Sequence, residues 1–234
     1  MPISILPSEV IDQIAAGEVV ERPAHLVKEL VENSLDAGAS RIVAEFSDGG
    51  RNITVTDNGH GISENELALS LERFATSKIS QTDDLWKLKT YGFRGEALAS
   101  IAAVSRFTII SKTADAEIAS RLVCEFGKRN SVDQIGGVQG TKIHIESLFE
   151  NVPARLKFMK SASSEHTQIK QTLKALALGR PDVEFQVFED GEMRLRFLKP
   201  DQTTKKPVAD ALYADDWHHA AMVLAYGESN SYYK

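Results

Sequence analysis

Hydrophobic side chains near the N-terminus of this chain recur at the spacing of an α-helix. In the stretch "RPAHLVKELVENSLDAG", Leu26, Leu30 and Val31 fall on one side of a helical wheel. Pro23 stands where a helix begins and Gly38 where one ends. By the same pattern and the same boundary residues, further helices are predicted at 7–17, 63–74, 83–88, from 96 onward and at 163–179.

After residue 40 the pattern changes to the alternation that is typical of β-strands. Ile42, Ala44 and Phe46 alternate with polar residues, so one face of this segment is predicted to be buried. The turn formers at 48–50 and at Asp190-Gly191 each separate two such segments and predict hairpins. Strands are therefore predicted at 41–47, 51–57, 106–112, 119–126, 141–147 and on both sides of the second turn between 183 and 199.

The order of these elements predicts an α+β fold. Helices come first and several adjacent strands are joined by hairpins, so we expect a mixed, mostly antiparallel sheet with helices on one face. The stretch "KPDQTTKKP" at 199–207 is polar and contains two prolines, which is typical of a linker. We expect one domain over 1–199, and over 200–234 a linker and the truncated start of a second domain, since so few residues cannot fold alone.

Composition and charge exclude some classes of protein. The 234 residues are 42% hydrophobic and 26% charged, which is sufficient for a packed core. The single cysteine, Cys124, excludes an intrachain disulfide and a cysteine metal cluster, and fits a cytosolic compartment. No apolar run approaches the roughly 20 residues that span a membrane. Because the formal net charge is −6, binding to nucleic acid would require a local basic patch.

A polar stripe follows one face of the predicted helix at 23–38. Glu29, Glu32, Asn33 and Asp36 are spaced at i, i+3, i+4 and i+7, so their side chains share a face opposite the apolar one. Such a stripe is usually a solvated surface, and the spacing alone does not distinguish that surface from a binding site.

Asp57 and the residues that follow it form one candidate ligand-binding loop. Asp57 ends a predicted strand and leads into "NGHGI", where Gly59 and Gly61 permit close approach of a backbone or a ligand. The same letters are also ordinary turn chemistry, and both interpretations remain open at this point.

A second candidate loop precedes the helix that is predicted to begin near Glu96. In "YGFRGEALAS", Gly92 and Gly95 flank a phenylalanine and Arg94, and the free N–H groups of a helix start suit an anion such as phosphate. The hydroxyls and lysine of "ATSKI", residues 75–79, are a weaker signal of the same kind. The common P-loop and dinucleotide-binding patterns are absent from the sequence.

Several of these strings together resemble one protein family. "IAAGEVVERPAHLVKELVENSLDAGAS", "DNGHGI", "RFATSKI" and "YGFRGEALASIAAVS", followed by "GTKIHI" and "NVPARLKF", resemble the N-terminal ATPase region of the MutL family of DNA mismatch repair proteins. The resemblance is dense over 1–160, and "GFRGEAL" is its most specific string. It implies the Bergerat-type ATPase sandwich that this family shares with gyrase, heat-shock chaperones and histidine kinases. "GFRGEAL" argues against the histidine kinase and topoisomerase branches.

The resemblance implies roles for residues of the stripe and the loops. Glu29 corresponds to the general base and Asn33 to the Mg²⁺ ligand, while Asp57 corresponds to the residue that reads adenine. Gly59 and Gly61 would make room for the base, and Thr141 would contact it through water. Glu32 and Asp36 are left as structural or solvated. The remaining implied nucleotide-binding residues are Asn58, Thr76, Ser77, Lys78, Gly92, Phe93, Arg94, Gly95, Glu96, Ala97 and Leu98.

The resemblance also implies a function and partners. We expect a slowly hydrolysing Mg²⁺-dependent ATPase whose ATP-driven dimerisation couples a mismatch-recognition protein to downstream repair factors. The expected location is cytoplasmic, of bacterial type and associated with the nucleoid, without contact to a membrane. DNA would be bound weakly and without sequence specificity, with candidate contacts at Arg155, Lys157, Lys160, Arg194 and Arg196. The alternative is a binding module, a nucleotide-gated clamp that binds ATP without hydrolysing it.

Overall fold

A single mixed sheet organises the part of the chain that the computed structural model describes, namely residues 7, 16, 20–79, 86, 90–92, 95–198 and 209–210. Its strands are β1 (Arg41–Ser47), β2 (Asn52–Asp57), β3 (Arg106–Lys112), β4 (Ala119–Glu125), β5 (Lys128–Arg129), β6 (Asp133–Ile135), β7 (Gly140–Glu146), β8 (Glu184–Glu189), β9 (Glu192–Phe197) and β10 (Ala209–Asp210). The helices are α2 (Pro23–Asp36), α3 (Glu64–Leu67), α4 (Ala97–Ala103), α5 (Pro153–Phe158) and α6 (Ala162–Gly179), with short 3-10 turns η1 (Asp48–Gly50) and η2 (Leu69–Leu71).

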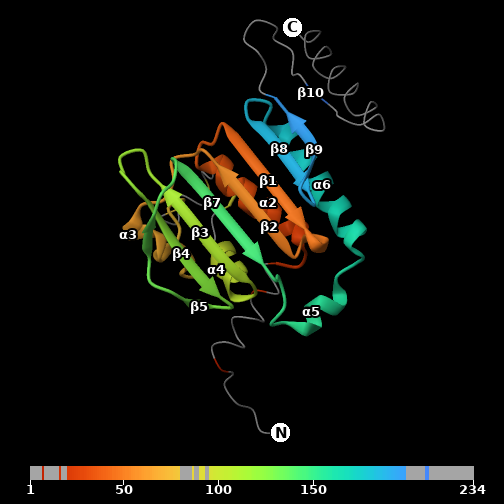
Figure 1. Ribbon diagram of the computed structural model, residues 1–234, viewed down its shortest axis with the longest axis horizontal. Coiled ribbons are helices and arrows are strands. Elements are labelled where there is room, and N and C mark those ends of the chain that lie inside the picture. The colour runs from red at the N-terminus through yellow and green to blue at the C-terminus, as the bar shows by residue number, and fades with distance from the viewer. Residues whose placement is uncertain are drawn as a thin grey trace, which may run out of the picture.

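The strand order is β10-β9-β8-β1-β2-β7-β3-β4-β5, and β6 also pairs with β4. Only β1 and β8 run parallel among the described pairs, and the others are antiparallel. Figure 1 shows α2, α4 and α6 behind the sheet, whose other face is turned to the viewer. The predicted α+β class, with a mostly antiparallel sheet and helices on one face, is therefore confirmed.

The core lies between α2 and the middle strands. Leu26, Leu30 and Val31 of α2 are at most 1% exposed, and Ile42 and Phe46 of β1 are also buried. Full burial of one such side chain contributes about 1.5–3 kcal/mol. The apolar side of α2 is thus fixed on the sheet, which determines the direction of its polar side.

Both predicted hairpins are present. Asp48 and Gly49 join β1 to β2, and Asp190 and Gly191 join β8 to β9. All four residues have positive φ angles, between 52° and 81°. Aspartate and glycine tolerate this left-handed conformation better than most residues do. The Asp-Gly residues of the two turns therefore predict correctly that β1 pairs with β2 and that β8 pairs with β9.

The prediction of one helix over 63–74 is wrong in the length of the helix. The segment forms α3 and η2 and ends at Phe74, whose φ of 63° is left-handed. The Ser63 hydroxyl donates to Glu66 Oε2 over 2.6 Å and does not cap a backbone N–H. Ser63 and Glu66 have the spacing of a capping box, but the reciprocal bonds from side chain to backbone are not formed.

Other predicted elements differ at their edges or lie outside the described residues. Four elements were not predicted, β5, β6, α5 and β10, and each of them is six residues or shorter. Of the helices predicted at 7–17 and 83–88, only Pro7, Ala16 and Trp86 are described, and the linker at 199–207 lies wholly outside. Among the described helices, none combines the length and apolarity needed to cross a membrane.

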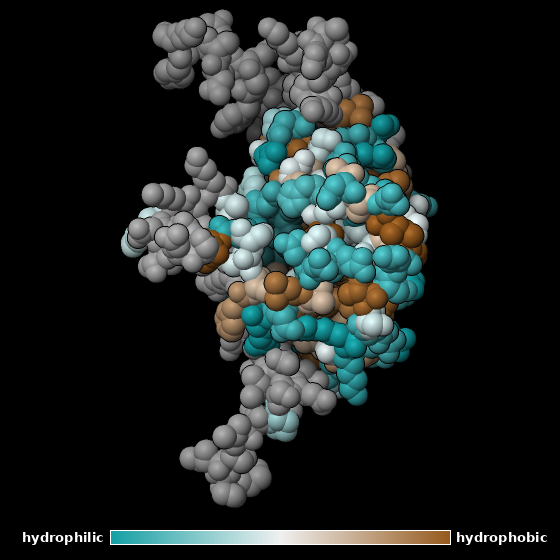
Figure 2. Space-filling model, turned by 90° about the vertical axis from the view of Figure 1, so that its left-hand side faces the viewer, coloured by the Kyte–Doolittle hydropathy of each residue, from teal (hydrophilic) through white to brown (hydrophobic). Residues whose placement is uncertain are grey.

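Figure 2 shows the side of the molecule that lies to the left in Figure 1. Over the described part of this face, hydrophobic residues occur in small groups that polar residues separate. A mixed surface of this kind is ordinary for a folded domain, so it does not identify a binding face.

Candidate functional site

Asp57 is the centre of a buried hydrogen-bond network at the end of β2. Asp57 is only 9% exposed to solvent. Its Oδ1 accepts from the backbone N–H of Gly59 over 2.9 Å and from that of Thr141 over 3.3 Å. The hydroxyl of Ser34, which α2 brings to the sheet, donates to Oδ2 over 2.8 Å. The side chain of Asp57 is therefore held in one orientation by α2, β7 and its own loop.

Strand register explains why these residues meet. Asp57 pairs with Thr141 across β2 and β7, and Thr141 pairs with Ser111 across β7 and β3. The hydroxyl oxygens of Ser111 and Thr141 lie 2.9 Å apart. Three neighbouring strands thus place three polar side chains in a row, and two of them, Asp57 and Thr141, are residues that the sequence predicts for the base-binding site.

The electrostatics of Asp57 suit a buried acceptor. Burial raises the pKa of the Asp57 carboxyl, and the N–H of Gly59, the hydroxyl of Ser34 and the N–H of Thr141 oppose that rise. An ionised carboxylate has about four acceptor positions, and three donors fill three of them. The fourth position receives no donor from the described residues.

Glycines let backbone segments pack closely around Asp57. A Cβ at Gly59 would lie 2.7 Å from the carbonyl oxygen of Ala37, and one at Gly61 would lie 2.1 Å from that of Lys112. Protein backbone therefore occupies the space beside both residues. Their predicted role in making room for a base stays a prediction.

The clash at Gly61 gives a testable expectation. Gly61→Ala should lower the free energy of unfolding by about 3 kcal/mol or more, because the left-handed strain of about 1–2 kcal/mol adds to the clash with Lys112. Gly38→Ala is the matched control, since Gly38 has a similar φ of 71° and no atom within 4 Å of the added Cβ. Gly38→Ala should lower the free energy of unfolding only by the left-handed strain of about 1–2 kcal/mol. Urea unfolding of both variants measures the difference, and equal losses would contradict the close approach at Gly61.

The polar stripe of α2 is partly buried. Glu32 is 7% exposed and its carboxylate lies 3.2 Å from Lys28 Nζ. Burial raises the pKa of Glu32, while Lys28 opposes the rise. Glu29 is half-buried, and within the described residues its carboxylate makes no hydrogen bond or ion pair. The stripe is therefore not a fully solvated surface, and Glu32 is its most buried member.

Asn33 and Asp36 contact residues from the predicted phosphate loops. Lys78 Nζ donates to Asn33 Oδ1 over 2.8 Å and lies 2.5 Å from Asp36 Oδ2. The backbone N–H of Tyr91 donates to Asp36 Oδ1 over 3.2 Å. The Thr76 hydroxyl accepts from the N–H of Lys78 over 3.1 Å and so shapes the turn that carries the lysine.

The other predicted phosphate-loop residues that the structure describes lie at the start of α4 or beside Lys78. A Cβ at Gly92 would be 3.6 Å from Lys78 Nζ. Gly95 accepts from the N–H of Phe74 over 3.0 Å, and this contact joins the two ends of the loop region. Glu96 precedes α4 without capping it through its side chain, Ala97 begins the helix, Leu98 packs against the core and Ser77 is exposed. Phe93 and Arg94 lie outside the described residues.

Asn58 is placed differently from the rest of the predicted set. Its Oδ1 accepts from the backbone N–H groups of Ser40 and Arg41, each over 2.9 Å, and its Nδ2 donates to the Ser40 hydroxyl over 2.9 Å. The amide therefore holds the start of β1. These contacts give no support to its predicted role with a nucleotide.

Sequence reasoning missed Ser34, Ser111 and the contacts of Asp36. Ser34 falls on the apolar side of the helical wheel, and a small polar residue among buried apolar ones was the available signal. Ser111 occupies a buried position of β3. Only strand register shows that it faces Thr141, because register depends on tertiary pairing.

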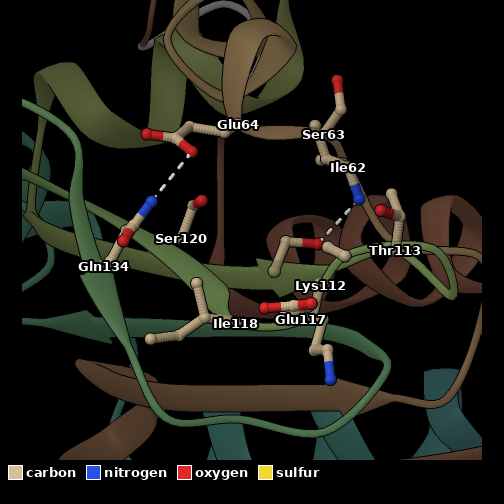
Figure 3. A pocket seen from close by; sticks show the side chains of 11 residues that line it. Ile62, Ser63, Glu64, Lys112, Thr113, Glu117, Ile118, Ser120 and Gln134 are labelled. Atoms are coloured by element: carbon tan, nitrogen blue, oxygen red, sulfur yellow. Dashed lines mark hydrogen bonds between the residues drawn. The ribbon is translucent and has the colours of Figure 1, made fainter.

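A cavity of about 220 Å³ borders this network. Figure 3 shows its lining residues, which come from α3, from the β3–β4 hairpin and from β6. Ser111 lines the cavity, accepts from the N–H of Ile62 over 2.8 Å and also contacts Thr141. None of the predicted site residues lines this cavity, so the predicted site lies beside it.

Comparison with known proteins agrees with this arrangement. Residues 21–157 match the family described as "Histidine kinase-, DNA gyrase B-, and HSP90-like ATPase". A protein of Xanthomonas axonopodis pv. citri named "DNA mismatch repair protein MutL" is 48% identical over 223 residues, which is 95% of this chain and 36% of that protein. One of the same name from Pelobacter propionicus is 49% identical over 200 residues, 85% of this chain and 33% of that protein.

The chain belongs to the MutL ATPase family. A solved structure described as the "Aquifex aeolicus MutL ATPase domain complexed with ADP" matches with a TM-score of 0.62 and 33% identity, covering 78% of this chain and 66% of that one. A second, the "N terminal domain of a DNA repair protein", matches with a TM-score of 0.69 and 27% identity, covering 83% and 58%. The chain spans about a third of the length of the curated MutL relatives it matches.

Proposed function

We propose that this MutL-type chain binds ATP together with Mg²⁺ and hydrolyses the ATP slowly, as the nucleotide switch of a DNA mismatch repair protein. The observation that carries the proposal is the buried Asp57 network, which stands beside the polar stripe of α2. The similar Aquifex aeolicus domain is described as complexed with ADP, which supports an adenine nucleotide as the ligand.

Asp57 is proposed to read the adenine base. Its carboxylate is fixed by Ser34, Gly59 and Thr141 and keeps one acceptor position. The exocyclic amine of adenine supplies a donor for that position, whereas guanine has a carbonyl there, which the carboxylate would repel. Thr141 is proposed as a second contact through water, since its hydroxyl lies next to Ser111 at the edge of the network.

Glu29 and Asn33 are proposed to act at the phosphates. They are four residues apart on α2, so they project from one face one turn apart. Asn33 Oδ1 accepts from the Lys78 ammonium, and this contact with a cation supports the proposal that the oxygen binds positive charge. Mg²⁺ held there would supply charge neutralisation for the phosphates. Glu29 would take the proton of the attacking water.

The wider function is proposed from the family. ATP-driven dimerisation would couple a mismatch-recognition protein to downstream repair factors, and residues 1–199 and 200–234 would be the ATP-binding domain and the start of the next. Of the candidate DNA contacts, Arg194 pairs with Glu189 and Glu192, and Arg196 pairs with Glu184. These two arginines lie on β9, far from α5 in Figure 1, so the five candidates do not form one patch. Arg155, Lys157 and Lys160, on or beside α5, are the better candidates.

Single-turnover kinetics tests the proposal against the non-hydrolysing clamp. With protein in excess over ATP, ADP should form when Mg²⁺ is present and should not form when it is chelated. Saturable ATP binding without any ADP would establish the clamp instead, and an absence of ATP binding would overturn both.

Asp57→Asn separates recognition from stability. The change is nearly isosteric, and loss of a charge-assisted hydrogen bond of roughly 1.5–3 kcal/mol should lower the affinity for ATP by about 10- to 150-fold.

The same variant tests the effect of the buried charge on stability. Burial raises the pKa of Asp57, so the folded protein loses stability as the pH rises from the ordinary aspartate range through the raised value. Asparagine does not ionise and should remove this loss at neutral pH. ATP titration and urea unfolding near pH 7 measure both effects, and unchanged ATP affinity would refute the adenine assignment.

A further inference from the structure

Lys78 places its ammonium group between two side chains of the polar stripe. Its Nζ is 2.8 Å from Asn33 Oδ1 and 2.5 Å from Asp36 Oδ2. The side chains of Lys78 and Asp36 are only 18% and 9% exposed, so this is not an ordinary surface ion pair. The N–H of Tyr91 occupies the other oxygen of Asp36 over 3.2 Å, which fixes the orientation of the carboxylate.

The Lys78 ammonium donates a hydrogen bond to Asn33 Oδ1, the oxygen that is proposed to bind Mg²⁺. Asn33 and Asp36 are three residues apart on α2 and therefore neighbours on its surface. An amide oxygen and a carboxylate oxygen side by side are donors that a hard divalent cation prefers. A lysine ammonium at hydrogen-bond distance from the same amide oxygen opposes such a cation by occupying the lone pair and by charge repulsion.

We propose that Asp36 is a positioning residue that holds Lys78 on Asn33 when no nucleotide is bound. The inference rests on the proposed function, because it takes Asn33 as the metal ligand. Held in this way, Lys78 keeps divalent cations from α2 of the nucleotide-free protein. An incoming triphosphate carries the negative charge that competes with Asp36 for the ammonium, and Asn33 Oδ1 then becomes free. Metal binding is thereby made conditional on nucleotide.

Manganese is a suitable probe, because the electron paramagnetic resonance signal of free Mn²⁺ reports binding without nucleotide or turnover. Lys78→Met should bind Mn²⁺ roughly tenfold more tightly than the parent, or better, since a competing unit charge has been removed. Adding Asn33→Ala to that variant should return the affinity to the parent level. Lys28→Met is the matched control, because Lys28 is on the same helix and pairs with Glu32 and not with Asn33. It should behave as the parent.

The inference is overturned if Lys78→Met binds Mn²⁺ no better than the parent, or if Lys28→Met gains as much. Asp36→Asn provides a second measurement that does not require folding of the Lys78 variant. In the nucleotide-free protein, acetylation of Lys78 followed by mass spectrometry should be at least about tenfold faster in Asp36→Asn than in the parent, and equal rates would overturn the positioning role. Failure of the proposed function would appear separately, as an absence of ATP binding by the parent.

Discussion

Replacing Glu29 with alanine is expected to lower the rate of ATP hydrolysis by about 10²–10⁴-fold, the usual contribution of a positioned general base. Mg-ATP should still bind, because Asn33 and Asp57 are untouched and Glu29 makes no hydrogen bond or ion pair with the other described residues. The variant should therefore accumulate in its ATP-bound form. Pre-steady-state ADP formation and equilibrium titration with ATP measure the two quantities on the same sample.

Glu32→Gln is the matched control for that experiment. Glu32 lies on the same side of α2, but it is buried and paired with Lys28. Its hydrolysis rate should stay at the parent value. If Glu29→Ala hydrolyses ATP at the parent rate, or if both variants lose activity equally, the assignment of Glu29 as the base is wrong.

Asn33→Ala should fail one step earlier, at binding. Loss of the partners that merely orient a metal ligand typically costs about 10–100-fold in metal affinity, so loss of the ligand itself should cost at least as much. Titration with a non-hydrolysable ATP analogue should show this loss when Mg²⁺ is present. Without Mg²⁺ the variant should show no such loss relative to the parent, because the amide oxygen then has no metal to hold.

Asn33→Asp keeps an oxygen at the same place and serves as the control. It should retain Mg²⁺-dependent binding of the analogue, which would show that the alanine variant fails for want of a ligand atom. Normal Mg-ATP affinity in Asn33→Ala would remove Asn33 from the metal site. It would also remove the basis for the competition with Lys78.

Local sequence pattern predicted the parts of the fold that depend on local chemistry. The period of Leu26, Leu30 and Val31 predicted α2 and the direction of its polar face, and the turn letters predicted both hairpins. The segment 63–74 also has a helical pattern, yet α3 ends at Leu67 and the 3-10 turn η2 follows it. A pattern of apolar residues does not reveal where a helix of this kind ends.

For the candidate site, Asp57, Asn33 and Glu29 could be named as candidates from the distinctive stretches in which they lie, and their roles stay predictions. The partner of Asp57 on α2, Ser34, could not, since its hydroxyl meets Oδ2 only after helix and sheet have packed. Asp36 was left as structural or solvated, and its contact with Lys78 joins residues 42 positions apart whose proximity depends on the tertiary fold.

We propose that the Asp57 network and the polar face of α2 form one adenine-nucleotide site that uses Mg²⁺, and this site can be tested as a whole. Its most direct test is calorimetric titration of the parent protein with non-hydrolysable analogues of ATP and GTP, each with Mg²⁺ and with a chelator. We expect saturable binding of the ATP analogue that is tighter with Mg²⁺, and much weaker binding of the GTP analogue, which lacks the 6-amino group from which Asp57 would accept. Equal affinity for the two analogues, or ATP-analogue affinity that is indifferent to Mg²⁺, would contradict it.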